Sequence, residues 1–153
     1  MSASSMFRKS APAQISRAAT GGRVNRGKPV SFTFDGRVLQ GYEGDTLASA
    51  LLANNIHLVG RSFKYHRPRG IIAAGPDAPT ALARVCHGAK AEPNLRATQV
   101  ELHDGLFAES QNRFPSLKFD IGAVNSALQA FFPTGFYYKT FMWPASMWMT
   151  YEH

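Results

Sequence analysis

Residues 30–55, VSFTFDGRVLQGYEGDTLASALLANN, carry the signals that decide the fold. Residues 30–34 alternate apolar and polar side chains and are rich in β-branched and aromatic types, which predicts a half-buried strand. Asp35-Gly36 follows, and a second strand-like stretch covers residues 37–42. Because both turn residues tolerate a positive φ, the pattern predicts a β-hairpin.

A helix is predicted directly after the hairpin. Asp45 is the expected N-cap, because its carboxylate can accept a hydrogen bond from a free N–H of the first turn. Apolar residues then recur at helical spacing, and Asn54-Asn55 is the expected end, since asparagine tolerates the left-handed conformation. Residues 56–59 are expected to return the chain to the sheet.

Three later segments complete the predicted domain. Residues 81–86, ALARVC, indicate a strand, whereas residues 87–95 contain Gly88 and Pro93 and indicate a loop. Residues 98–103, TQVELH, alternate so regularly that they predict a strand with one solvated face. The order β-β-α-β-β predicts an α+β fold of the β-grasp type, a small mixed sheet with one helix packed across it.

Positive charge is concentrated in two stretches of the chain. The 153 residues include 17 basic and 10 acidic side chains, for a net charge of +7. Ten of the basic residues lie in two stretches that contain no acid, so the rest of the chain has a net charge of −3. The first stretch is residues 1–28 (Arg8, Lys9, Arg17, Arg23, Arg26 and Lys28), and the second is part of RSFKYHRPRGIIAAG, residues 61–75 (Arg61, Lys64, Arg67 and Arg69). Residues 1–28 are predicted to form a flexible basic tail.

The basic loop at residues 61–69 is a candidate anion site. Arginine forks suit phosphate or carboxylate groups, so Arg61, Lys64, Arg67 and Arg69 are the candidate anion contacts. The open alternative is a solvated loop whose aromatic residues hold it to the sheet. No RNP motif, helix-turn-helix pattern or zinc-finger spacing accompanies the loop, so nucleic acid is not an expected partner.

The residues that could carry metal or catalytic chemistry are sparse. Cys86 is the chain's one cysteine, and the loop of residues 70–85 contains none. A plant-type 2Fe–2S cluster needs four thiolates, so the sequence predicts no cluster and no metal site. A single cysteine also fits a reducing compartment such as the cytoplasm. No nucleophile elbow, P-loop or dinucleotide fingerprint is present, so no catalytic residue is expected.

The C-terminal third is unusually aromatic. Asp120 is predicted to cap a helix that carries one apolar stripe and stops at Pro133. Nine of the chain's 18 aromatic residues fall within residues 131–151. So many aromatic side chains predict an interface, with the candidate contacts Phe136, Tyr137, Tyr138, Phe141, Trp143 and Trp148. Two alternatives stay open, namely that these residues complete the core of this domain or that they pack against a second copy. No apolar run approaches the roughly 20 residues of a membrane span.

Four blocks of the sequence together resemble one known family. They are GRVNRGKPVSFTFDGRVLQGYEGDTLASALLANNI (22–56), GRSFKYHRPRGIIAAG (60–75), SQNRFPSLKFDIGAVN (110–125) and GFYYKTFMWP (135–144). In this order they resemble the N-terminal region of the alpha subunit of heterotetrameric sarcosine oxidase. The resemblance implies a plant-type ferredoxin-like β-grasp that has lost its cluster, because several relatives keep the cysteines. The downstream cysteine position of those relatives falls near Ala97-Thr98.

The resemblance also implies a domain plan and a set of partners. Residues 1–28 would be the tail, 29–110 the β-grasp domain without a cluster, and 111–153 a helical and aromatic extension that leads to an NAD-binding domain outside this chain. The expected partners are the rest of the alpha subunit and the other sarcosine oxidase subunits. The complete flavoenzyme is implied to demethylate sarcosine oxidatively with FAD, FMN, NAD and tetrahydrofolate. None of the motifs that bind these cofactors falls in the chain.

The expected role is therefore a structural and interaction domain of an oxidoreductase complex, inert as an isolated fragment. One alternative is an electron-transfer module of a related amine or opine oxidase, with a cluster shared between chains. A second alternative is an anion or nucleic-acid binder that uses the basic loop 61–69.

Overall fold

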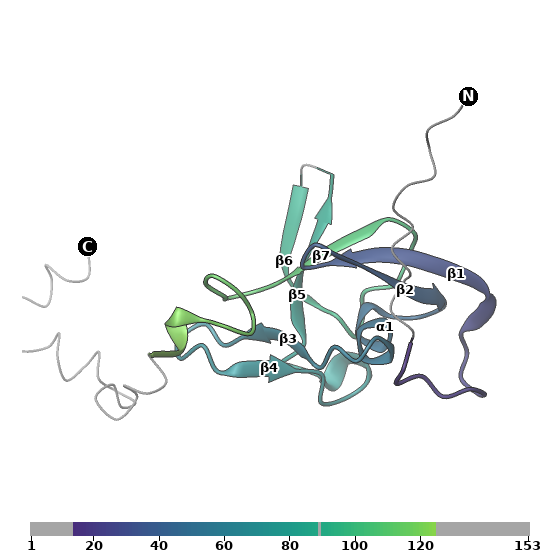
Figure 1. The fold of residues 1–153 in the computed structure, drawn as a ribbon, viewed down its shortest axis with the longest axis horizontal. Coiled ribbons are helices and arrows are strands. Elements are labelled where there is room, and N and C mark those ends of the chain that lie inside the picture. The colour runs from purple at the N-terminus through teal and green to yellow at the C-terminus, as the bar shows by residue number, and fades with distance from the viewer. Residues whose placement is uncertain (1–13, 89, 125–153) are drawn as a thin grey trace, which may run out of the picture.

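The computed structural model describes residues 14–88 and 90–124, and its centre is a five-stranded sheet of order β2-β1-β7-β5-β6 (Figure 1). The hairpin of β1 (Asn25–Phe34) and β2 (Arg37–Glu43) forms one side of this sheet. Its turn has φ values of 49° at Asp35 and 74° at Gly36, which confirms the predicted hairpin.

The N-terminal boundary of the domain differs from the prediction. Strand β1 begins at Asn25, so the expected limit of a flexible tail at residue 28 falls inside the strand. Before the strand, the Arg17 guanidinium binds the buried Asp45 carboxylate at 2.6 Å. The basic residues of this stretch are therefore partly used within the fold, while residues 1–13 lie outside the described part of the chain.

Helix α1 (Leu47–Ala53) follows the hairpin, as predicted, but its N-cap is Thr46. The Ser49 N–H donates to the Thr46 hydroxyl at 3.2 Å, and the Thr46 N–H donates to the Ser49 hydroxyl at 2.9 Å. This reciprocal pair is a capping box, and it replaces the predicted cap at Asp45. The helix ends at Ala53 with Asn54 as its C-cap, and Asn55 takes a φ of 58°, which confirms the predicted stop.

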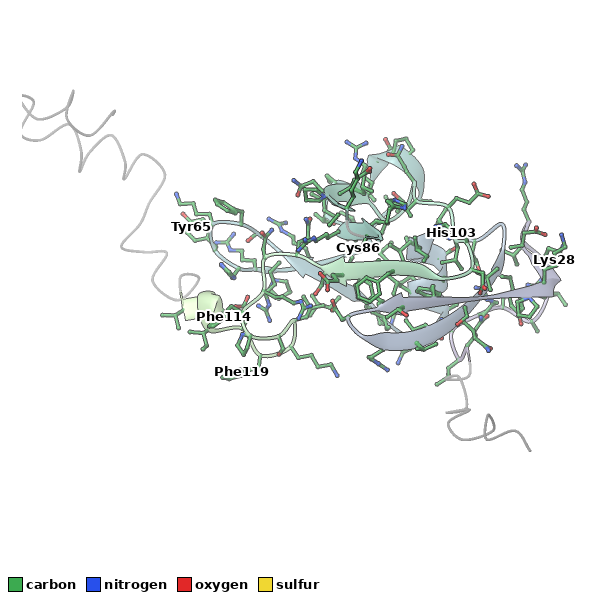
Figure 2. All side chains as sticks on the ribbon, turned by 90° about the horizontal axis from the view of Figure 1, so that it is seen from above. Lys28, Tyr65, Cys86, His103, Phe114 and Phe119 are labelled. Carbon is green, nitrogen blue, oxygen red and sulfur yellow. The ribbon has the colours of Figure 1, made fainter. Side chains whose placement is uncertain are left out.

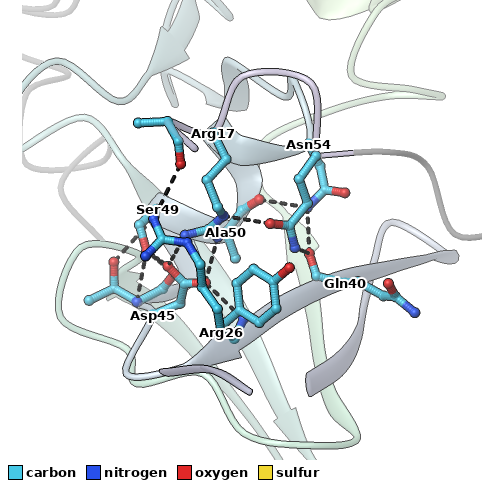
Figure 3. A network of polar contacts seen from close by, with 11 residues as sticks. Arg17, Arg26, Gln40, Asp45, Ser49, Ala50 and Asn54 are labelled. Carbon is cyan, nitrogen blue, oxygen red and sulfur yellow. Dashed lines mark hydrogen bonds and ion pairs between the residues drawn. The ribbon is translucent and has the colours of Figure 1, made fainter. Parts of the chain in front are cut away.

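The Asp45 carboxylate joins the helix to the hairpin and to the N-terminal segment (Figure 3). It accepts hydrogen bonds from the Tyr42 N–H at 2.9 Å and from the Ser49 hydroxyl at 2.7 Å, in addition to the ion pair with Arg17. All of these donors reach one buried carboxylate, so Asp45 connects the N-terminal segment, 28 residues upstream, to the adjoining end of β2 and start of α1.

The strand predicted at residues 98–103 does not form. The carbonyl of Ala97 accepts from the Ala48 N–H at 2.9 Å, and that of Val100 accepts from the Leu47 N–H at 2.8 Å. These are free N–H groups of the first turn of α1, so the segment satisfies the helix terminus and is not available as a sheet strand. The alternation is real, however, because Thr98 and Leu102 are buried and Gln99 is exposed.

The other side of the sheet is formed by β5 (Leu82–His87), β6 (Lys90–Arg96) and β7 (Leu106–Ser110). Strand β5 confirms a prediction, whereas β6 contradicts the predicted loop at residues 87–95. Pro93 is tolerated in β6 because that strand lies at the sheet edge, and the pairing with β5 shifts register there. Strand β7 was not predicted, and it pairs in parallel with β1 and antiparallel with β5.

Residues 58–61 return to a separate small sheet. Strand β3 (Leu58–Arg61) pairs with β4 (Pro68–Gly70), and this hairpin extends towards the end of the molecule where residues 111–124 lie (Figure 1). The prediction that this segment joins the main sheet is therefore wrong, because β3 pairs with β4. The Arg61 N–H still donates to the Gln111 carbonyl at 3.1 Å, which ties the hairpin to the segment that follows β7.

The hydrophobic core lies where α1 packs on the main sheet. Its strand members recur at every second position, as expected for one face of a sheet. Among the described residues, the buried apolar core runs from Phe32 to Ala108 and takes no member from residues 111–124. A mixed sheet with one helix across it fits the predicted β-grasp-like α+β fold.

The predicted C-terminal helix is described only at its beginning. The Gly122 N–H donates to the Asp120 carboxylate at 2.9 Å, so Asp120 is a cap as predicted, here of the short 3-10 helix η2 (Ile121–Ala123). The rest of the predicted helix and the aromatic extension lie outside the described residues. Within the described ranges, no helix has the length and apolar character needed to cross a membrane.

Candidate functional site at the loop after β4 and the adjoining hairpin

The loop between β4 and β5 takes the place of the expected cluster-binding loop. It contains the 3-10 helix η1 (Gly75–Asp77), and two threonine hydroxyls hold it. Thr80 donates to the Gly70 carbonyl at 2.7 Å, and Thr98 donates to the Gly75 carbonyl at 2.6 Å. Thr98 adjoins the position expected for the downstream cysteine of the relatives, so the structure brings that position against the loop.

A cavity of about 470 Å³ lies between this loop and the beginning of α1. Its lining combines small and aliphatic residues with three hydroxyl groups, and it contains no thiol, imidazole or carboxylate. The lining residues are Thr46, Ala48, Ser49, Leu52, Ile71, Ile72, Ala73, Ala74, Gly75 and Thr98. These side chains offer none of the thiolates that bind an iron–sulfur cluster.

The other residues that could bind a metal ion also do not suit a 2Fe–2S cluster. Cys86 lies within β5, which follows the loop, and is paired with Phe107 of β7 and Ala91 of β6. Among residues 14–88 and 90–124, no three His, Cys, Asp or Glu side chains are grouped so that they could hold a metal ion. The residues present therefore do not fit a 2Fe–2S cluster, which requires four thiolates or, in some centres, two thiolates and two imidazoles.

The basic loop forms the tip of the β3–β4 hairpin, and Arg61 is used internally there. Its guanidinium donates to the carbonyls of Leu117 at 2.9–3.0 Å and of His66 at 2.8 Å. It also lies 3.2 Å from the Asp120 carboxylate, and only 9% of its side chain is exposed. The donors of Arg61 therefore bind acceptors of the same chain, and its role as an anion contact stays a prediction.

The three remaining cations of the basic loop have different surroundings. Lys64 and Arg67 lie over the ring of Tyr65, at 5.1 and 5.0 Å from its centroid. Arg69 is exposed and lines, with Arg61, a cavity of about 440 Å³ beneath the hairpin. Lys64 and Arg67 therefore make cation–aromatic contacts, and the anion contacts of Lys64, Arg67 and Arg69 stay predictions.

The Asp120 carboxylate connects this hairpin to residues 111–124. It accepts from His66 Nδ1 at 2.8 Å and from the N–H groups of Gly122 and Phe114 at 2.9 and 3.2 Å. Burial alone would raise the pKa of Asp120, but the hydrogen bonds from His66, Gly122 and Phe114 and the charge of His66 lower its pKa below the ordinary value. Sequence reasoning found Asp120 as a cap and missed this pairing, because His66 and Asp120 are 54 residues apart.

Residues 114–124 present four large apolar side chains to solvent. Their exposed fractions are 67% for Phe114, 69% for Phe119, 53% for Ile121 and 56% for Val124. We call these four residues the end face; Phe114 and Phe119 lie at the same end of the molecule as Tyr65 (Figure 2). The predicted interface residues Phe136, Tyr137, Tyr138, Phe141, Trp143 and Trp148 lie outside the described residues.

Comparisons of the sequence with known proteins agree with the resemblance. The sequence model of the family described as "2Fe-2S iron-sulfur cluster binding domain" matches residues 27–113. The chain is 67% identical over 127 residues to sarcosine oxidase subunit alpha of Rhizobium meliloti (strain 1021), which covers 83% of this chain and 13% of that protein. It is 44% identical over 103 residues to sarcosine oxidase subunit alpha of Corynebacterium sp. (strain U-96), which covers 65% of this chain and 11% of that protein.

A solved structure, that of L-proline dehydrogenase from P. horikoshii, matches with 32% identity and a TM-score of 0.46, over 59% of this chain and 17% of that chain. The chain spans 13% and 11% of the length of the two curated relatives. The predicted resemblance to the N-terminal domain of the sarcosine oxidase alpha subunit is confirmed by these matches. By the match over residues 27–113, the chain belongs to the family of 2Fe-2S iron-sulfur cluster binding domains, as a member whose donor residues do not fit the cluster.

Proposed function

We propose that this chain is a structural and interaction domain of a sarcosine oxidase alpha subunit and that it transfers no electrons itself. The observation that carries the proposal is the loop after β4. There the hydroxyl of Thr98 donates to the Gly75 carbonyl, and the adjoining cavity is lined by side chains that include no thiol or imidazole to hold a 2Fe–2S cluster. The similarity to two alpha subunits of sarcosine oxidase supports the assignment to that complex.

The proposed partners are the rest of the alpha subunit and the other subunits of the complex. In this proposal the flavins, NAD and tetrahydrofolate bind outside this chain, in the cytoplasmic complex that oxidatively demethylates sarcosine. The chain contributes surfaces and no catalytic residue. The aromatic residues of 131–151 are the proposed contact to the rest of the subunit, since such clusters are typical of interfaces.

Assembly in trans tests this role. A tagged form of the chain is co-expressed with a sarcosine oxidase alpha subunit that lacks its own matching segment, together with the partner subunits. We expect the tagged chain to co-purify in a one-to-one ratio with that subunit and to restore sarcosine-dependent oxygen consumption. A matched pair of variants, Phe141→Ser and Val38→Ser, separates the aromatic contact from a general loss of apolar surface.

The result that would overturn the proposal is a folded, tagged chain that fails to co-purify while an intact alpha subunit assembles normally. Normal co-purification of Phe141→Ser would remove Phe141 from the interface. Loss of co-purification in Val38→Ser as well would show a general effect of lost apolar surface, because Val38 lies on β2 and is 63% exposed.

A further inference from the structure

The end face has the composition of a contact surface. Phe114, Phe119, Ile121 and Val124 are each more than half exposed and lie within eleven residues of one another. Isolated exposed apolar residues are normal, but a cluster of large ones marks a contact surface. The core contains no residue of 111–124, so these side chains do not belong to the interior of the domain.

The backbone that carries the end face is firmly held. The Ile121 N–H donates to the Phe114 carbonyl at 2.8 Å, and the Phe119 N–H donates to the Ser116 hydroxyl at 3.1 Å. The buried Asp120 carboxylate fixes both ends of the same turn, through the N–H groups of Phe114 and Gly122. The apolar side chains are therefore exposed on a preformed turn and not on an unfixed loop.

The chain itself supplies a complementary occupant. Val124 is the last described residue and is part of the end face, and six residues separate it from the aromatic segment at residues 131–151. That segment holds nine aromatic residues and three methionines, and Lys139 is its one charged residue. Aromatic and methionine side chains are enriched in contact surfaces, and a short tether holds a segment near its target at an effective concentration in about the millimolar range.

We propose that the aromatic segment, residues 131–151, packs on the end face of its own chain. In this position the segment would present its remaining aromatic side chains outwards, to the rest of the alpha subunit. The inference thus extends the proposed function by saying how the aromatic contact surface is held. The anchoring rests on the end face and the tether alone, so it stands whether or not the assembly experiment succeeds.

Tryptophan fluorescence of the complete 153-residue chain tests this contact, because Trp143 and Trp148 are the chain's only two tryptophans and both lie in the segment. We expect blue-shifted emission that is protected from acrylamide in the unaltered chain. Replacing Phe119 or Ile121 by serine, in separate variants, should shift the docking equilibrium by roughly tenfold or more, with red-shifted emission and stronger quenching. Val38→Ser is the matched control, because Val38 is equally exposed but lies on β2.

Three results would overturn the proposal. Tryptophans that are already open to acrylamide in the unaltered monomer would show that nothing covers the segment. Protected tryptophans that stay protected in both Phe119→Ser and Ile121→Ser would place the segment elsewhere. Protection that disappears on dilution together with a dimer in sedimentation would make a second copy the occupant. Amide exchange of the β1, β5 and β7 strands shows that each variant is folded, and two independent variants keep the test decisive if one of them is not.

Discussion

At the scale of single residues, Asp45 is a buried acidic side chain with several hydrogen-bond donors around it. Its buried carboxylate binds Arg17, the Tyr42 N–H and the Ser49 hydroxyl. Asp45→Ala leaves these donors without their acceptor, and we expect a loss of about 3–5 kcal/mol in the free energy of unfolding, measured in urea. The exposed pair Lys28–Glu43 is the matched control, so Glu43→Gln should leave the midpoint unchanged. Equal effects of the two variants would mean that burial of the Arg17–Asp45 pair contributes nothing.

A pH dependence is expected from Asp120, whose pKa is lowered in the folded chain. A carboxyl with a lowered folded pKa adds stability that is fully present above its unfolded pKa, about 3.9, and that is lost as the pH falls through the folded value. The free energy of unfolding should therefore fall more steeply below about pH 4 in the unaltered chain than in Asp120→Asn. Parallel curves for the two proteins would contradict the assignment.

The residue scale also shows where a local pattern is insufficient. Aspartate and threonine are both good N-caps, so the sequence Asp45-Thr46 does not decide between them. The choice is made by Arg17, which lies 28 residues upstream and binds the Asp45 carboxylate, leaving Thr46 to form the capping box. Similarly, Arg61 has the charge of an anion contact, but only the folded chain shows that Leu117 and His66 occupy its donors.

At the scale of elements, the β1–β2 hairpin and α1 could be predicted because their signals are local. The Asp35-Gly36 turn and the helical spacing of residues 47–53 each require only neighbouring residues. The conformation of residues 98–103 could not be predicted. Their apolar and polar side chains alternate as in a strand, but the carbonyls of Ala97 and Val100 accept from N–H groups at the N-terminus of α1. Strand β6 was not predicted because it contains Pro93. A strand can accommodate proline at the edge of a sheet, and the sequence does not show that β6 is an edge strand.

The close packing of β2 on α1 gives a prediction at this scale. A methyl group at Gly41 would collide with the Leu102 side chain and crowd Ala50, and Leu102 is buried. Gly41→Ala should therefore cost about 1–3 kcal/mol of overpacking, measured as a lower thermal or urea midpoint. Gly27→Ala on β1 is the control, because a methyl group there meets only the Asn25 side chain at 3.4 Å. A Gly41→Ala protein as stable as Gly27→Ala would show that the hairpin and helix separate easily.

At the scale of the whole molecule, a cluster-binding family has a member in which the fold is kept and the donors are absent. Residues 27–113 match the family, yet the chain contains one cysteine, placed on β5. The missing donors could be read from the sequence alone, since a cluster needs thiolates that the chain does not have. The hydrogen bond from the Thr98 hydroxyl to the Gly75 carbonyl could not be predicted. The two residues are 23 positions apart in sequence and come together only in the folded chain.

The most direct test of a ferredoxin-like domain without a cluster is the iron content of the complete chain after anaerobic reconstitution with iron and sulfide. The purified chain and the Cys86→Ser variant are desalted, and iron, acid-labile sulfide and the visible spectrum are measured. We expect both proteins to be colourless and to hold the same background of iron. Two irons and two sulfides per chain with charge-transfer absorption in the unaltered protein would contradict the central claim.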